Sequence, residues 1–329
     1  MVLRAVTAEK AMEYFHGNTL FRWGPDLANE HKPLKPEWAA ARLQQTIFEA
    51  GIRPSFKLKR GDLVYAAGSC FARNIEKNLL LNGMNLLFNP EEIRQRPEFE
   101  VENTAYRENF LIKYNTPTIL NDIFHAGNEG EDRRLVYELS PGQFFDARLG
   151  AYPLTDFDTI MARRQFIRQK SREIGNCACV IFTLGLSEAW FDIEAGEYLN
   201  YFPDLRFVNN HRRSLELHIL DYDQHVALLR KAINMLKERG VENVVITVSP
   251  VPLISTFTEE DVVVANEYSK AALRAAAAAV CAETGADYFP SYEMVKYSDR
   301  QYAWRGDARH VTDPMVAEVT GRFVRNYVE

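Results

Sequence analysis

Short runs of consecutive apolar residues alternate with amphipathic segments along most of the chain. Several runs have the length and continuity of buried strands: 63–67, 85–88, 179–184, 243–248 and 286–289. The segments between them place apolar residues at the helical period and predict helices at 71–79, 157–174, 222–239, 261–284 and 312–328. Buried strands that alternate with helices are typical of a mostly parallel sheet with helices on both faces. The pattern therefore predicts a doubly wound α/β fold, in which one main domain carries insertions.

The remaining parts of the chain are less regular. Residues 1–60 are expected to form a lead-in that packs on the main domain at 61–329, with one helix at 36–50. Residues from about 90 to 175 are interpreted as an insertion, with a hairpin within 135–151. Residues 191–220 are expected to be irregular and rich in β-structure. The sequence leaves open whether residues 1–60 act as a lid, as a partner surface or in packing alone.

Composition and charge narrow the classes of partner. The 329 residues are 47% hydrophobic and 26% charged, which is ordinary for a globular protein. The net charge of −6 lacks the basic excess typical of nucleic-acid binding, so no nucleic-acid partner is expected. The basic cluster at 163–172 is interpreted as the solvated face of a helix. The N-terminus lacks the apolar stretch of a signal peptide and no run is long enough to span a membrane, so we expect a cytoplasmic protein without a membrane span.

The cysteines and glycines suggest neither a metal nor a cofactor. The four cysteines, at positions 70, 177, 179 and 281, form no Cys-x-x-Cys pair, so no disulfide scaffold and no zinc site are expected. Cys177 and Cys179 lead into an apolar run and are interpreted as core thiols. No glycine-rich nucleotide-binding motif occurs, so no nucleotide cofactor is expected. The oligomeric state is left open.

Ser69 is the first candidate functional residue. It follows the strand predicted at 63–67 and starts the next helix. The free N–H groups and positive dipole at a helix start favour negative charge, so the Ser69 amide could also help to hold an oxyanion. Gly185 and Ser249 also directly follow predicted strands. We therefore expect these three residues to share the carboxyl edge of the sheet, where α/β proteins bind ligands. The alternative for Ser69 is a helix N-cap without chemistry.

A second motif, Asp307-Ala308-Arg309-His310, lies between the last predicted strand and the last predicted helix. Asp307 is three positions before His310, so its carboxylate can orient one ring nitrogen while the other faces Ser69. A serine hydroxyl becomes a useful nucleophile when an imidazole takes its proton and a carboxylate orients that imidazole. Ser69, Asp307 and His310 are therefore the candidate catalytic residues.

These residues lie within a recognisable pattern. Gly68-Ser69-Cys70-Phe71-Ala72 resembles the motif that names the GSCFA family, which is similar to the SGNH/GDSL hydrolases. The resemblance covers roughly residues 60–325, with further motifs at 182–190, 247–253, 268–270 and 288–293. It implies a flavodoxin-like three-layer α/β/α sandwich, with Ser69 as nucleophile, His310 as base and Asp307 as the residue that orients it. It also implies a serine-dependent hydrolase acting on a small-molecule or carbohydrate ester.

The chain departs from the general SGNH pattern near the oxyanion. The usual Gly-Asp-Ser is Gly68-Ser69-Cys70 here, and the block Gly185-Leu186-Ser187-Glu188 lacks the asparagine that typically donates to the oxyanion. Asn115 and Asn210 are the candidates to replace it, and a simple turn role for Asn115 is an equal alternative. The residues expected to contact the substrate or the oxyanion are Gly68, Asn115, Gly185, Ser187, Glu188 and Asn210.

Several alternatives remain open. A thiol at a helix N-terminus can have a depressed pKa, so Cys70 could be the nucleophile, although its side chain is expected to point into the core. The same chemistry could pass the acyl group to a sugar hydroxyl, as in a carbohydrate O-acyltransferase. The missing asparagine also leaves room for a non-catalytic binding module on a hydrolase fold. Trp190 is expected either to line the pocket or to pack in the core.

Overall fold

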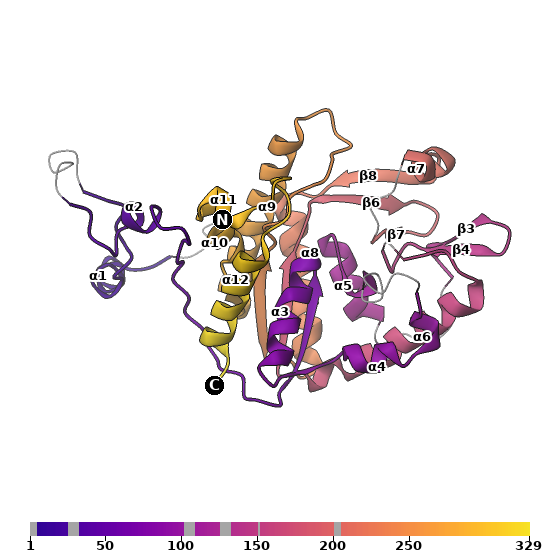
Figure 1. The fold of residues 1–329 in the computed structure, drawn as a ribbon, viewed down its shortest axis with the longest axis horizontal. Coiled ribbons are helices and arrows are strands. Elements are labelled where there is room, and N and C mark those ends of the chain that lie inside the picture. The colour runs from indigo at the N-terminus through magenta and orange to yellow at the C-terminus, as the bar shows by residue number, and fades with distance from the viewer. Residues whose placement is uncertain (1–4, 26–32, 102–108, 126–132, 151, 201–204) are drawn as a thin grey trace.

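The structure is a computed structural model that describes residues 5–25, 33–101, 109–125, 133–150, 152–200 and 205–329 (Figure 1). Its centre is a five-stranded sheet made of β1 (Leu63–Gly68), β2 (Asn85–Leu86), β5 (Cys179–Leu184), β9 (Asn243–Val248) and β10 (Asp287–Tyr288). All neighbouring strands run parallel, in the order β10-β9-β5-β1-β2. Counted along the chain, this order is 2-1-3-4-5, the flavodoxin-like arrangement. The predicted α/β fold with a mostly parallel sheet is confirmed.

Helices cover both faces of this sheet. One face carries α3 (Cys70–Leu81), α10 (Ser291–Tyr297), α11 (Arg300–Ala303) and α12 (Asp313–Tyr327) (Figure 1). The other face carries α5 (Thr116–His125), α6 (Phe157–Ser171), α8 (Tyr222–Glu238) and α9 (Val262–Thr284). Side chains alternate along a strand, so Val64 packs against the face that carries α3 and α12, and Tyr65 against the face that carries α8 and α9. This burial on both faces explains why the central strands are apolar at consecutive positions.

Most predicted elements are present, with small shifts at their ends. β5 and β9 have the predicted bounds, and the five predicted helices correspond to α3, α6, α8, α9 and α12. The helix expected at 36–50 is wrong, because only α2 (Ala39–Arg42) forms there. The spacing of Trp38, Ala39, Leu43 and Ile47 suggested a longer helix. Ile47 instead packs from irregular backbone against the core between the sheet and the helices α3 and α12, which we call the α3–α12 core. Tertiary packing thus replaces the helix that their spacing predicted.

The first 60 residues divide into two parts. α1 (Ala8–Gly17) lies away from the sheet (Figure 1), and none of its residues is buried. Leu58, by contrast, is buried in the α3–α12 core, and its backbone pairs with Val328 at the end of α12.

Smaller elements lie between the strands of the main sheet. β3 (Val136–Ser140) and β4 (Gln143–Asp146) form the predicted hairpin. β6 (Glu188–Asp192) pairs antiparallel with β7 (Glu197–Tyr198) and β8 (Leu215–Ile219), so the expectation of β-structure within 191–220 is confirmed. Elements that the sequence patterns did not predict are α1, α5, α10, α11, α4 (Pro90–Arg94), α7 (Leu205–His211) and the 3-10 turns Pro97–Phe99 and Asn109–Leu111. The end of the helix predicted at 157–174 is a 3-10 turn, Arg172–Asn176.

The basic cluster at 163–172 is only in part the solvated face that its charge predicted, because Arg172 is exposed but two of the other arginines are buried. Arg163 and Arg164 are 3% and 8% exposed. Arg164 makes a two-pronged ion pair with Asp146 of β4, with nitrogen–oxygen distances of 2.6 and 2.5 Å, and Arg163 lies over the ring of Tyr152. A buried guanidinium of this kind requires a carboxylate or an aromatic partner. The partners come from outside the helix, so its own pattern could not reveal them.

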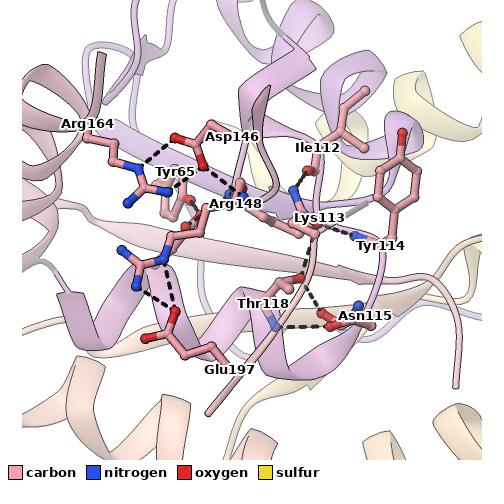
Figure 2. Close-up of polar contacts among 12 residues, drawn as sticks. Tyr65, Ile112, Lys113, Tyr114, Asn115, Thr118, Asp146, Arg148, Arg164 and Glu197 are labelled. Atoms are coloured by element: carbon pink, nitrogen blue, oxygen red, sulfur yellow. Dashed lines mark hydrogen bonds and ion pairs between the residues drawn. The ribbon is translucent and has the colours of Figure 1, made fainter. Parts of the chain in front are cut away.

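Figure 2 shows the polar network that continues from this ion pair towards the segment 112–115. Arg148 pairs with Glu197 at 2.5 Å. Lys113 pairs with Asp122 of α5 at 3.0 Å. The buried side chain of Asn200 accepts a hydrogen bond from the Tyr114 amide at 3.0 Å and donates to the Ile112 carbonyl oxygen at 2.6 Å.

The segment 112–115 in turn lies against the carboxyl ends of two central strands. The Lys113 amide donates to the Gly68 carbonyl oxygen at 2.7 Å, at the end of β1. Asn115 pairs with Leu186, just beyond β5. The network therefore holds the segment 112–115 against the edge of the sheet where ligands bind in folds of this type.

Candidate active site

β1 ends at Gly68, where the chain comes very close to β5. Gly68 has a φ of 136°, and a Cβ at this position would lie 2.1 Å from the carbonyl oxygen of Thr183. The next residue, Ser69, donates its amide hydrogen to the same carbonyl oxygen at 3.0 Å. Only glycine fits here. The Ser69 amide, which the sequence offered as a donor to an oxyanion, is already paired with β5.

Ser69 is the N-cap of α3 and is 7% exposed. Its Oγ accepts a hydrogen bond from the Phe71 amide at 3.2 Å and donates to Ser249 Oγ at 2.8 Å. Ser249 directly follows β9 and is 1% exposed. The predicted meeting of Ser69 and Ser249 at the carboxyl edge is therefore confirmed. The capping role considered for Ser69 is also present, and it leaves the serine hydroxyl at the positive end of a helix.

Asp307 and His310 lie in the turn between α11 and α12. Asp307 Oδ1 accepts from the amides of Arg309 and His310, both at 3.0 Å, and Asp307 Oδ2 lies 2.5 Å from His310 Nδ1. Ala308 has a φ of 54°, the left-handed conformation that closes this tight turn. The hydrogen bond from the His310 side chain, followed by the two amides, holds the pKa of Asp307 well below its usual value. The carboxylate thus orients the imidazole and makes Nδ1 the protonated nitrogen.

The turn that carries His310 is more exposed than Ser69. The side chains of His310 and Asp307 are 52% and 48% exposed. His310 Nε2 lies 3.2 Å from Arg309 Nη1. Val311, the next residue, packs in the same core as Phe71, so the turn lies near the start of α3. The structure therefore brings the two halves of the expected triad into one region. It does not join them, because Ser69 Oγ is bonded to Ser249 and His310 Nε2 to Arg309.

Cys70 differs from expectation in two ways. The residue is exposed and does not point into the core. Although Cys70 reaches the surface, the surrounding protein disfavours the thiolate and raises the pKa, against the opposing effects of Arg309 and Lys270. A nucleophilic Cys70 would need the depressed pKa that its place at a helix N-terminus suggested. The direction of the pKa shift argues against that alternative.

The block 185–188 is occupied by structural contacts. Gly185 packs against the segment 112–115, because a Cβ on it would lie 2.6 Å from the Tyr114 carbonyl oxygen. Ser187 is fully buried, with its Oγ 2.8 Å from His225 Nε2. Glu188 accepts a hydrogen bond from Thr256 Oγ1 at 2.6 Å and so holds the loop after β9. The polar atoms of Ser187 and Glu188 thus have partners other than Ser69 and His310.

The two asparagines proposed as oxyanion donors lie in different places. Asn115 is buried, its Oδ1 caps the first turn of α5, and its Nδ2 donates to the Leu199 carbonyl oxygen at 3.2 Å. Asn210 is exposed on α7, at the outer end of the β6–β8 sheet (Figure 1), so the structure does not bring it to Ser69. Trp190 packs edge-on against Phe257 within a separate apolar core, the second of its two expected roles.

Two buried polar side chains near this edge were not predicted as site residues. Lys270 of α9 is 1% exposed, and its Nζ donates to the carbonyl oxygens of Gly185 at 2.9 Å and Val251 at 2.8 Å. His225 of α8 joins Ser187 to Thr116, and burial lowers its pKa to about 4. The signal that could have found both is a polar residue on the apolar stripe of an amphipathic helix.

The elements that build this site are the part of the chain that matches a known family. The GSCFA family matches residues 63–323, from the first residue of β1 into α12. The chain belongs to the GSCFA family. Its match includes every residue of the candidate site described above. Comparison with curated proteins found no match.

Within the GSCFA chain, no group of three or more His, Cys, Asp and Glu side chains among the described residues is placed to hold a metal ion. No helix in the same part of the chain is both long and apolar enough to cross a membrane. Cys177 and Cys179 are buried free thiols, as predicted, and burial raises the pKa of Cys177 to about 12.

Proposed function

We propose that this GSCFA protein is a serine-dependent ester hydrolase. The observation that carries the proposal is the Asp307–His310 pair, in which a carboxylate orients an imidazole and leaves Nε2 free of the carboxylate. Two further observations support it. Ser69 lies at the positive end of α3, and the Arg309 charge beside His310 acts on Cys70, the neighbour of Ser69. An activated serine with a nearby imidazole is suited to acyl transfer from an ester.

In the proposed reaction, Ser69 Oγ attacks the carbonyl carbon of the ester and its proton passes to His310 Nε2. His310 then protonates the leaving alcohol, and an acyl-Ser69 ester remains. A water molecule that gives its proton to His310 attacks this ester, releases the acid and restores the Ser69 hydroxyl. Asp307 stabilises the charged imidazole in both steps.

The oxyanion requires a donor other than the Ser69 amide, which is paired with Thr183. Our candidate is the amide of Cys70, the first residue of α3. N–H groups in the first turn of a helix are free of intrahelical partners and are favoured at developing negative charge.

Two contacts must change before the Ser69 proton can move. The hydrogen of the Ser69 hydroxyl must rotate from Ser249 Oγ towards His310 Nε2, while the two serine oxygens stay in contact and Ser249 donates to Ser69 Oγ in return. Arg309 must also leave His310 Nε2. The same contacts favour a second candidate function, a non-catalytic binding module, in which Ser69 remains a helix cap and His310 remains paired with Arg309.

Labelling with a fluorophosphonate probe, which reacts with activated serines, separates these functions. We expect the wild type to be labelled at Ser69, and the label to be absent from Ser69→Ala and from His310→Ala. Ser187→Ala and His225→Ala are matched controls, because they remove the other, buried serine–histidine pair and should retain the label. A folded wild type that takes no label would favour the binding module, and a label lost only from Ser187→Ala would contradict the assignment of Ser69.

A further inference from the structure

Lys270 is a buried cation whose partners are backbone carbonyls. It is 1% exposed, and no carboxylate pairs with it among the described residues, since its Nζ contacts the Gly185 and Val251 carbonyl oxygens. Burial lowers its pKa to about 7, against the opposing effects of Cys70 and Glu267. A methionine of similar length would avoid the cost of removing an amine from water, but it would leave these two carbonyl oxygens without their donor. What the lysine adds here is therefore a bridge between the two carbonyl groups.

The two carbonyl groups belong to the segments that form the Ser69 edge of the sheet. Gly185 directly follows β5, and Val251 lies two residues after Ser249 in the loop after β9. The Val251 amide donates to Ser249 Oγ at 3.3 Å, and Ser249 Oγ accepts from Ser69 Oγ at 2.8 Å. A continuous series of contacts therefore leads from Lys270 through Val251 and Ser249 to the Ser69 hydroxyl.

Other residues hold the later part of the same loop. The Asn266 side chain accepts from the Leu253 amide at 3.2 Å, and Glu188 accepts from Thr256 Oγ1 at 2.6 Å. Lys270 acts closer to Ser249 than either of them, at Val251. Removal of Lys270 should therefore free the start of the loop while its later part stays in place.

We propose that Lys270 is a positioning residue for Ser69, because it ties the loop after β9 to the end of β5 and so holds the Ser249 hydroxyl that orients the Ser69 hydroxyl. The inference rests on the proposed function of Ser69. It assigns Lys270 no contact with the substrate. Its effect on the reaction passes through Ser249, and this dependence can be measured.

The first test is the rate of fluorophosphonate labelling in Lys270→Met, Ser249→Ala and the double variant. We expect Lys270→Met to slow labelling by on the order of 10²-fold, the scale of a small misplacement of a reacting group. The double variant should be little slower than the slower single variant, because both changes break the same series of contacts. Lys296→Met, which removes an exposed lysine paired with Glu267, is the matched control and should label at the wild-type rate. Unchanged labelling in folded Lys270→Met, or losses that multiply in the double variant, would overturn the proposal.

The second test is hydrogen exchange, which does not depend on activity. In Lys270→Met we expect faster exchange of the Ser249 and Val251 amides, which alternate with two prolines, and unchanged exchange in α8. Lys296→Met should change neither. Wild-type exchange of the Ser249 and Val251 amides in Lys270→Met would contradict the positioning role. If the wild type takes no label but exchange changes as expected, the proposed function fails while the hold of Lys270 on the loop stands. Should Lys270→Met not fold, Lys270→Gln keeps an N–H donor and is expected to give intermediate values in both measurements.

Discussion

The Ser69 side of the candidate site is buried and built from the ends of parallel strands, whereas the His310 side is an exposed turn between two helices. Ser69 and Ser249 are 7% and 1% exposed and are hydrogen-bonded to each other. About half of the His310 side chain is exposed, and among the described residues its hydrogen bonds are with Asp307 and Arg309 of the same turn. One side is held by the main sheet and the other by its own local hydrogen bonds.

This difference decides how substitutions on each side should affect folding and activity. The close approach of Gly68 to Thr183 and the bonds of Ser249 leave the Ser69 backbone little freedom. The His310 turn keeps its internal geometry through Asp307, and Val311, which follows it, packs in the same core as α3. We therefore expect changes on the Ser69 side to affect both folding and activity, and changes on the His310 side to affect activity with little effect on folding.

The largest expected effect is the loss of either candidate catalytic residue. Ser69→Ala and His310→Ala should each lower the rate of ester hydrolysis by on the order of 10⁴-fold, because members of a triad act as a unit. Steady-state hydrolysis of a p-nitrophenyl ester measures both. Thermal unfolding should separate the two sides, since only Ser69→Ala removes a helix cap, at a cost of about 1 kcal/mol. Wild-type hydrolysis in either variant would rule out its catalytic role.

Substitutions at two glycines, one on each side of the site, test the difference between the two sides through the free energy of unfolding. Gly68→Ala should lower the free energy of unfolding by about 2 to 5 kcal/mol, because its Cβ would lie 2.1 Å from a backbone oxygen at a φ of 136°. A Cβ on Gly306, beside Asp307, would meet no other described part of the chain within 4 Å, so Gly306→Ala should change stability by less than about 1 kcal/mol. Urea unfolding measures both. Equal losses in the two variants would show that the turn is packed as tightly as the strand end.

The buried amine on the Ser69 side predicts a pH dependence of stability. The pKa of Lys270 is lowered to about 7, whereas an unfolded lysine titrates near 10.4, so the unfolded chain binds more protons between these values. Stability therefore rises with pH in this window, by up to about 2 kcal/mol between pH 7 and 8.5. Urea unfolding at several pH values should show this rise in the wild type and a flatter profile in Lys270→Met. Lys296→Met should keep the rise, because the lysine that it removes has a raised pKa and does not titrate in this window. Parallel profiles in all three would contradict the shift.

The sequence predicted the position of Ser69 at the edge of the sheet better than it predicted the polar contacts around the site. β5 and β9 were located correctly because strands buried on both faces are continuously apolar, and parallel strands end at one edge, so the meeting of Ser69 and Ser249 followed. The contacts of Arg164 and Lys270 could not be predicted in the same way. Their partners, Asp146 and the Gly185 carbonyl, are brought to them only by the tertiary fold. The contact of Arg309 with His310 depends on side-chain rotation within a turn, which no spacing encodes.

That contact gives the smallest effect and the sharpest test of the His310 side. Arg309 Nη1 lies 3.2 Å from His310 Nε2, the atom that must accept the Ser69 proton. Arg309→Ala removes this competing contact, so we expect labelling of Ser69 by an uncharged fluorophosphonate to become up to about tenfold faster, the scale of one hydrogen bond. Arg305→Ala is the control, because it removes an arginine of the same turn that pairs with Asp313. Slower labelling in Arg309→Ala would instead mean that the guanidinium holds the turn against α3, and that the exposed side of the site depends on Arg309 for its position.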